Sequence, residues 1–218
     1  MSDWLIWQVM DSAFPTGAFA HSWGLESAWQ HGEVDGPAAL RQFLEASVHQ
    51  AGYAALPLVN AAFDAPEKLE LLDDLAEVFL INVVANRASR VQGRTLAATA
   101  ARVWPTPGLE RLEIRVQATY AHGAPVSGAV FKTLGLTRGS TQRVVLYGVA
   151  KGVLSAAVRL GIVGSYEAQR IQQTCGPWLD RVAAECADLS AADLAQTAPL
   201  IDMLQGGHDR LYSRLFQS

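Results

Sequence analysis

The chain carries little charge for its length. Of 218 residues, 17% are Asp, Glu, Lys or Arg, whereas 50% are apolar, a balance more apolar than that of an ordinary soluble domain. Such a surplus indicates a large core, a surface that binds other proteins, or both. The net charge is −4 and the basic residues are scattered. A surface that follows nucleic-acid phosphates is therefore not expected.

Targeting and redox signals are also scarce. The first residues lack the basic region of a signal peptide. The apolar stretch 144–163 is interrupted by Lys151 and Arg159, so no membrane span is expected. The only cysteines, Cys175 and Cys186, have no Cys-x-x-Cys spacing and are too few for a disulfide framework. We expect two reduced thiols in a cytoplasmic protein.

Common catalytic and nucleotide-binding motifs are missing. The sequence contains no G-x-x-x-x-G-K-[ST], G-x-G-x-x-G, G-x-S-x-G or H-E-x-x-H pattern, so we expect neither a P-loop nor these catalytic sites. Its five histidines lie far apart and show no metal-ligand spacing. No catalytic residue and no metal ligand is predicted, and the chain is not expected to be an enzyme.

An acidic cluster supports the one enzymatic alternative. Asp73, Asp74 and Glu77 fall within about one helical turn. Helical prenyl-diphosphate enzymes use Asp-rich turns to hold magnesium and a diphosphate. Such enzymes usually have two facing clusters and a basic clamp, and only one cluster is present here. A solvated helix face is the preferred interpretation.

The pattern predicts an all-α fold: a single compact multi-helix domain over residues 1–218. No stretch shows sustained period-two alternation. Pro57 is expected to kink or divide its helix. The longest segment, 67–104, is apolar nearly all round, so we expect it to form a long buried central helix. The expected helices span residues 4–10, 23–31, 37–64, 67–104, 109–120, 126–134, 140–160, 166–174, 177–187 and 199–211.

The segment 11–26 is the most informative part of the chain. Pro15 favours an extended backbone at Phe14, and Gly17 permits a turn that residues with a Cβ adopt poorly. Phe14 and Phe19 need burial, so the loop is expected to be held against the body. His21 and the next residue then lead into the helix over 23–31.

Cations lie on two predicted helices. Arg87, Arg90 and Arg94 share one face, and their acidic partners lie either in this chain or on another protein. Lys151 and Arg159 interrupt an apolar run and are expected to form internal ion pairs.

Glycines indicate close helix packing. Gly93 lies in a helix interior, where glycine costs about 1 kcal/mol relative to alanine, so a close contact is expected there. Gly148, Gly152 and Ala156 recur every four residues, which also indicates packing rather than a binding site.

The last residues, 205–218, have the composition of a docking tail. Leu215 and Phe216 stand beside Arg214. Termini fray unless they are held down, so this tail either binds a partner or folds onto its own body.

Four blocks of the sequence resemble the UreF family of urease accessory proteins. They are residues 14–26, residues 87–94, residues 122–126 together with 154–160, and residues 213–216 with Ser218, preceded by Pro199, Asp202 and His208. Their order and spacing cover nearly the whole chain. The sequence departs from the usual family pattern in the loop 162–166 and at Gln217.

The resemblance implies an all-α cytoplasmic adaptor in urease maturation that is not an enzyme. Members of the family bind UreD, called UreH in some organisms, and recruit the GTPase UreG for nickel delivery to apo-urease. They are commonly homodimeric within that assembly. Nickel and GTP belong to the wider assembly, so no cofactor is expected on this chain. An unrelated helical interaction module is the main alternative.

The resemblance also implies where partners bind. The expected positions lie in the first block, the arginine stripe and the tail. They are Phe14, Pro15, Gly17, His21, Ser22, Gly24, Glu26, Arg87, Arg90, Gly93, Arg94, Arg214, Leu215, Phe216 and Ser218. UreG would be modulated either by an arginine finger from the stripe or, as we prefer, by allosteric ordering.

Overall fold

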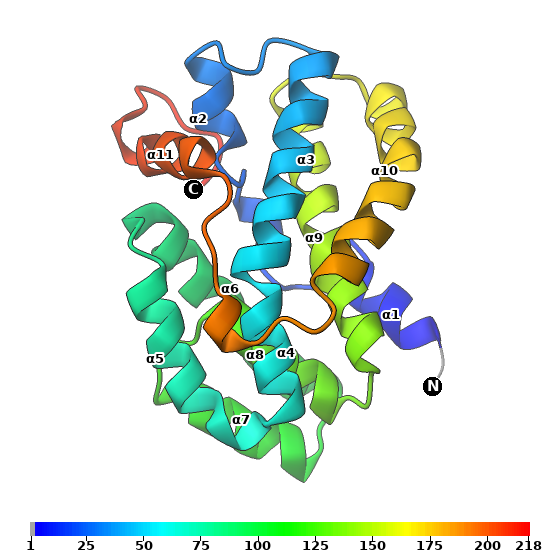
Figure 1. Cartoon of the computed structure of the whole chain (residues 1–218), viewed down its shortest axis with the longest axis vertical. Coiled ribbons are helices and arrows are strands. Elements are labelled where there is room, and N and C mark those ends of the chain that lie inside the picture. The colour runs from blue at the N-terminus through cyan, green and yellow to red at the C-terminus, as the bar shows by residue number, and fades with distance from the viewer. Residues whose placement is uncertain (1–2) are drawn as a thin grey trace.

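A computed structural model describes residues 3–218 and confirms the all-α class. Within those residues there is no β-strand (Figure 1). The α-helices are α1 (Asp3–Met10), α2 (Leu25–Gln30), α3 (Pro37–Ala54), α4 (Leu56–Asp64), α5 (Leu69–Phe79), α6 (Val83–Val103), α7 (Pro107–Gln117), α8 (Gly123–Thr133), α9 (Arg138–Arg159), α10 (Ser165–Glu185) and α11 (Pro199–Gly206). Short 3₁₀ helices are η1 (Ala18–Ala20), η2 (Pro66–Lys68), η3 (Ala191–Asp193) and η4 (His208–Arg210).

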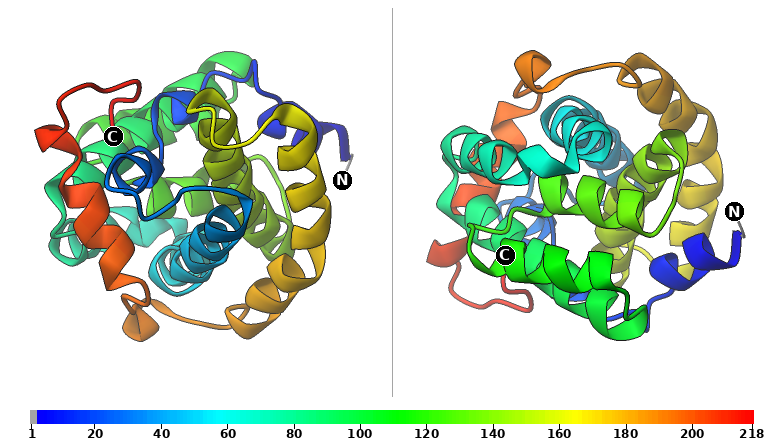
Figure 2. Two further views of the ribbon diagram at one scale, coloured as in Figure 1. Left: turned by 90° about the horizontal axis from the view of Figure 1, so that it is seen from above. Right: turned by 90° about the horizontal axis from the view of Figure 1, so that it is seen from below.

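Two main clusters of buried side chains form the core. The larger cluster joins α2, α3, α9 and α10, and the second joins α6, α7 and α8. Helix α9 contributes to both, through Val149 in the larger cluster and Val144 in the second. It runs through the middle of the molecule between α3 and α10 on one side and α8 on the other (Figures 1 and 2). The long buried central helix is therefore α9.

The prediction of one continuous helix over residues 67–104 is wrong. Helix α5 ends at Phe79 and α6 begins at Val83. Asn82 caps α6, because its side-chain oxygen accepts hydrogen bonds from the N–H groups of Val84 at 3.0 Å and Ala85 at 3.3 Å. Ile81 between the helices is 83% exposed, so the apolar pattern around the break does not face the core.

Two prolines act differently in their helices. The chain divides just before Pro57, as expected, and Pro57 occupies the first turn of α4. Helix α10, in contrast, continues through Pro177, so the two helices expected over 166–174 and 177–187 are one. Cys175 and Cys186 are free and buried. In the described chain, no helix is both long and apolar enough to cross a membrane.

Candidate functional site

The C-terminal tail folds onto the N-terminal loop. We call this contact of residues 213–218 with residues 20–30 the C-terminal latch. The main-chain N–H of Ser22 donates to the Ser218 carbonyl oxygen at 2.6 Å, and the Ser22 hydroxyl donates to the same oxygen at 2.9 Å. The Gln217 N–H donates to the Ala20 carbonyl at 2.8 Å. The Gln30 side chain donates to the Ser213 carbonyl at 2.8 Å, so the tail is held along its length.

A buried carboxylate on α2 is the centre of the latch. Glu26 is 1% exposed. One oxygen accepts from the Leu215 N–H at 2.6 Å, and the other accepts from the Phe216 N–H at 3.1 Å. His208 Nε2 lies 3.0 Å from that second oxygen. A buried carboxylate needs such partners, so Glu26 fixes where the tail backbone runs.

Arg159, the last residue of α9, also contacts the latch. Its guanidinium stacks on Phe216, with the ring centroid 4.1 Å away, and on Phe19 at 4.0 Å. It also donates to the Phe19 carbonyl at 2.6 Å. Lys151 likewise donates to a carbonyl, that of Met10. The prediction of internal ion pairs is therefore wrong. Carbonyl oxygens accept hydrogen bonds from both cations, and Arg159 also stacks on aromatic rings.

His21 links the latch to the interior. Its Nδ1 lies 2.5 Å from the Ser218 hydroxyl oxygen. Burial lowers the pKa of the ring below its usual 6.5, and the charges of Arg87 and His208 lower that pKa further. The imidazole is therefore neutral near pH 7. Its Nε2 is buried and has no hydrogen-bond partner within residues 3–218.

The arginine stripe divides into three environments. Arg87 donates to both oxygens of Asp209, at 3.1 and 2.8 Å, and Arg214 reaches the same carboxylate at 3.2 Å. The Arg87 hydrogen bond lowers the pKa of Asp209. Arg90 lies over the Tyr120 ring at 5.2 Å. Arg94 is exposed and makes no such contact with the described residues. The stripe thus joins α6 to the tail only through Arg87.

Gly93 sits against the turn between α7 and α8. A Cβ at this position would lie 2.8 Å from the His122 carbonyl carbon and 2.9 Å from the Gly123 nitrogen. The close contact expected at Gly93 is present, and it is a contact within the chain.

The first block is pinned at its start. Phe14 packs on Trp104 with ring centroids 5.5 Å apart, and the Pro15 carbonyl accepts from the Thr99 hydroxyl at 2.8 Å. Gly17 and Gly24 have φ values of 75° and 84°, which residues with a Cβ rarely adopt. These positions set the path of the loop. Phe19, unlike Phe14, does not pack inside the body.

Phe19 does not follow the expected burial. It is 65% exposed, so the prediction that it packs inside the body is wrong. Its ring instead carries the Arg159 guanidinium at the surface. Sequence reasoning flagged Arg159 as a cation in an apolar run but missed its place in the latch, together with Gln30 and Asp209. Arg159 and Gln30 lie far from the tail in sequence, Asp209 pairs with Arg87 across 122 positions, and no local pattern indicates these contacts.

The acidic cluster is partly structural. The expected solvated face is wrong for Asp73, which is fully buried. Its two oxygens accept from the Ala121 N–H at 3.0 Å and the His122 N–H at 2.6 Å. These bonds hold the start of α8 against α5. Asp74 is exposed.

Glu77, the third member of the cluster, takes part in a chain of hydrogen bonds. It accepts from the Asn86 side chain at 2.9 Å and lies 2.8 Å from His122 Nε2. The other ring nitrogen of His122 is 3.2 Å from the Ser89 hydroxyl oxygen. The Asn86 and His122 hydrogen bonds lower the pKa of Glu77. No group of three or more His, Cys, Asp or Glu side chains in the described chain is arranged to hold a metal ion.

Comparison with known proteins gives consistent matches. The sequence profile of the UreF family matches residues 34–176. Urease accessory protein F from Arabidopsis thaliana is 36% identical over 221 residues, covering 99% of this chain and 92% of the relative. Its namesake from Oryza sativa subsp. indica is 35% identical over 219 residues, covering 98% and 84%. Urease accessory protein UreF from Rhodopseudomonas palustris is 30% identical over 215 residues, covering 96% and 89%.

Proposed function

The chain belongs to the UreF family of urease accessory proteins, and on that premise we propose that it is the adaptor of a urease maturation complex. In this proposal it binds UreD (UreH), recruits the GTPase UreG and supports nickel delivery to apo-urease. It works in the cytoplasm, as a homodimer within the complex, and catalyses no reaction itself. Nickel and GTP are held by the partners rather than by this chain.

The observation that carries the proposal is the C-terminal latch. It joins the first block and the tail, residues 205–218, which the family resemblance assigns to partner binding, into one continuous surface. Of the expected partner-binding positions in these two segments, the buried ones are His21, Ser22, Gly24, Glu26, Phe216 and Ser218. They shape the surface from within. The exposed members, including Arg214 and Leu215, which is 53% exposed, are available to a partner.

The surface near the latch has the character of a partner interface. Leu200 and Met203 on α11 are each 73% exposed, and Tyr212 at the start of the tail is fully exposed. Exposed apolar side chains grouped with arginines are typical of protein interfaces. Together they support UreD binding at this end of the molecule.

UreG modulation follows one of two routes. Arg87 and Arg90 already pair with Asp209 and Tyr120. The Arg94 guanidinium, in contrast, makes no such contact with the residues that the structure describes. Arg94 is therefore the stripe residue best placed to act as an arginine finger. We favour allosteric ordering of UreG, which predicts that Arg94→Ala leaves GTPase stimulation unchanged. Loss of stimulation with UreG binding retained would favour the finger.

Co-expression with the UreD homologue of the same genome tests the proposal. The complex is isolated by size-exclusion chromatography, and its mass is measured by light scattering. A stoichiometric complex that then captures UreG supports the adaptor role and gives the number of subunits. A well-folded chain that does not bind a soluble, competent UreD would contradict it.

A further inference from the structure

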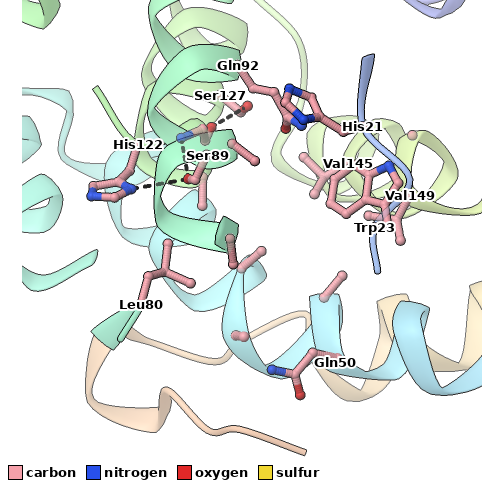
Figure 3. A pocket seen from close by; sticks show the side chains of 18 of the residues that line it. His21, Trp23, Gln50, Leu80, Ser89, Gln92, His122, Ser127, Val145 and Val149 are labelled. Carbon is pink, nitrogen blue, oxygen red and sulfur yellow. Dashed lines mark hydrogen bonds between the residues drawn. The ribbon is translucent and has the colours of Figure 1, made fainter. Parts of the chain in front are cut away.

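A cavity of about 330 Å³ lies where the two core clusters meet. Helices α3, α6, α8 and α9 supply half of the residues that line it. Figure 3 shows His21 and Trp23 entering from the N-terminal segment, Leu80 on the opposite side, and Gln50 farther along the wall. Segments from both ends of the chain thus contribute to its wall.

The wall is mostly apolar, and several of the side chains that form it are small, which leaves the space open. Ala51, Ala88, Ala124 and Gly148 all face it. A Cβ added at Gly148 would meet no atom within 4 Å, so this face of α9 has room beside it. An apolar pocket of this size is typical of a site that binds a small molecule.

Charge is nearly absent from the wall. Of the side chains that line the cavity in the described chain, only that of Asp202 is a carboxylate, and none belongs to Lys or Arg. Asp202 already accepts from the Asn82 side chain at 3.0 Å. A charged ligand would lose its hydration without gaining a partner, so the cavity suits a neutral one.

Two residues that line the cavity carry a buried ring nitrogen without a hydrogen-bond partner in the described chain, His21 Nε2 and Trp23 Nε1. The Trp23 nitrogen lies against Gly152, which does not line the cavity. His21 lines the cavity and is 5% exposed, and its Nε2 accepts and donates no hydrogen bond within the described residues. Its Nδ1 is occupied by the Ser218 hydroxyl. Because the tautomer depends on which of those two groups donates, Nε2 is either a donor or an acceptor. A hydroxyl group serves both cases, since it can donate or accept.

We propose that this cavity binds a small neutral molecule that is largely apolar and carries one hydroxyl group directed at His21 Nε2. Ligand sites are typically concave, apolar and furnished with a few convergent polar groups. The volume is about twice the ~150 Å³ of an apolar cavity that holds benzene, which sets the size near that of a fused two-ring alcohol. The site is independent of any partner protein.

The probe for the test is 1-naphthol, and 1-naphthoate is its charged counterpart. Binding of each to the whole chain is measured by isothermal titration calorimetry. The neutral wall predicts that 1-naphthol binds and that 1-naphthoate binds at least about tenfold more weakly. This comparison uses the unaltered protein, so it is decisive even where a variant does not fold.

A matched pair of variants locates the site. Gly148→Leu places a side chain in the cavity and is expected to weaken 1-naphthol binding by at least about tenfold. Gly139→Leu makes the same change on the same helix, at an exposed position that does not line the cavity. It should bind 1-naphthol like the unaltered chain. Both folds are checked by circular dichroism.

Three results would overturn the proposal. They are absence of 1-naphthol binding, binding of 1-naphthoate as tight as that of 1-naphthol, and unchanged affinity in a folded Gly148→Leu variant. Selective 1-naphthol binding that is lost in Gly148→Leu and kept in Gly139→Leu would establish the site.

Discussion

The Glu26 carboxylate accepts a hydrogen bond from the main-chain N–H of Phe216 at 3.1 Å, across 190 positions of sequence. This contact ties the tail to the first helix after the N-terminal loop. It explains why both segments share one surface, although each has too few apolar residues to form a core alone. Glu26 is thus a central one of several contacts that hold the tail in place.

Replacing Glu26 with Gln is expected to release the tail. The amide presents an N–H₂ group to backbone donors, which leaves buried polar groups unpaired at a cost of about 2 kcal/mol. Urea unfolding should show this loss, and limited proteolysis should cut within residues 211–218. Glu45→Gln, the same change at an exposed position of α3, is the control. An intact tail and unchanged unfolding in the Glu26 variant would refute the role of the latch.

Neighbouring aspartates on α5 provide a second matched test. Asp73→Asn should lower the free energy of unfolding by about 1–3 kcal/mol, since a buried amide cannot accept both N–H groups at the start of α8. Asp74→Asn changes an exposed side chain and should stay within about 0.5 kcal/mol. Urea denaturation measures both. Equal effects would mean that Asp73 does not hold α8 in place.

Two glycines in helix interiors should respond in opposite directions. Gly93→Ala forces a methyl group into the backbone of the turn before α8 and should destabilise the fold by about 1–3 kcal/mol or more. Gly148→Ala meets open space and should stabilise it by up to about 1 kcal/mol through helix propensity. Thermal unfolding of the two variants gives the comparison. A stable Gly93→Ala protein would show that α6 and the turn can separate.

The lowered pKa of His21 predicts a pH dependence of stability. Its usual value is 6.5, and burial, followed by Arg87 and His208, lowers it in the folded state. As the pH falls through 6.5, the unfolded chain takes up a proton that the folded ring resists, so the free energy of unfolding decreases. The stability is present above that pH and is lost below it.

The measurement is urea unfolding from about pH 7.5 to about pH 5.5. The Glu77 and Asp209 carboxyls, whose pKa values lie below 4.5 and 3.8, titrate outside this window. A His21→Gln variant should therefore show a flatter profile than the unaltered chain. Identical slopes for the two proteins would rule out His21 as the source.

Local sequence signals predicted most helices but not where the longest one breaks. The segment 67–104 is apolar nearly all round in its sequence pattern, which suggested burial, yet Val83 is 72% exposed. The informative residue was Asn82, a strong N-cap type that the hydrophobic pattern hides. Pro177 misled in the opposite sense, because a proline in the interior of a helix normally ends or kinks it.

The latch shows what a single sequence cannot predict. The residues of segment 14–26 and of the tail were singled out, but their pairing was not. Leu215 and Glu26 meet across 189 positions. A contact between residues so far apart in the chain produces no local periodicity in the sequence. Arg159 was expected to pair with a carboxylate, but it lies between Phe19 and Phe216. Tertiary packing decides such contacts.

The most direct test of the adaptor surface is the affinity for UreD of a variant altered at the exposed face of the tail. Leu215→Asp changes a side chain that is 53% exposed and leaves the Glu26 hydrogen bond to its backbone in place. Ile114→Asp, at an exposed position of α7, is the control. Helix α7 lies away from α2 and α11 in Figure 1. Leu215→Asp is expected to weaken UreD binding at least about tenfold, while Ile114→Asp binds normally. Unchanged affinity of a folded Leu215→Asp protein would contradict the proposed adaptor surface.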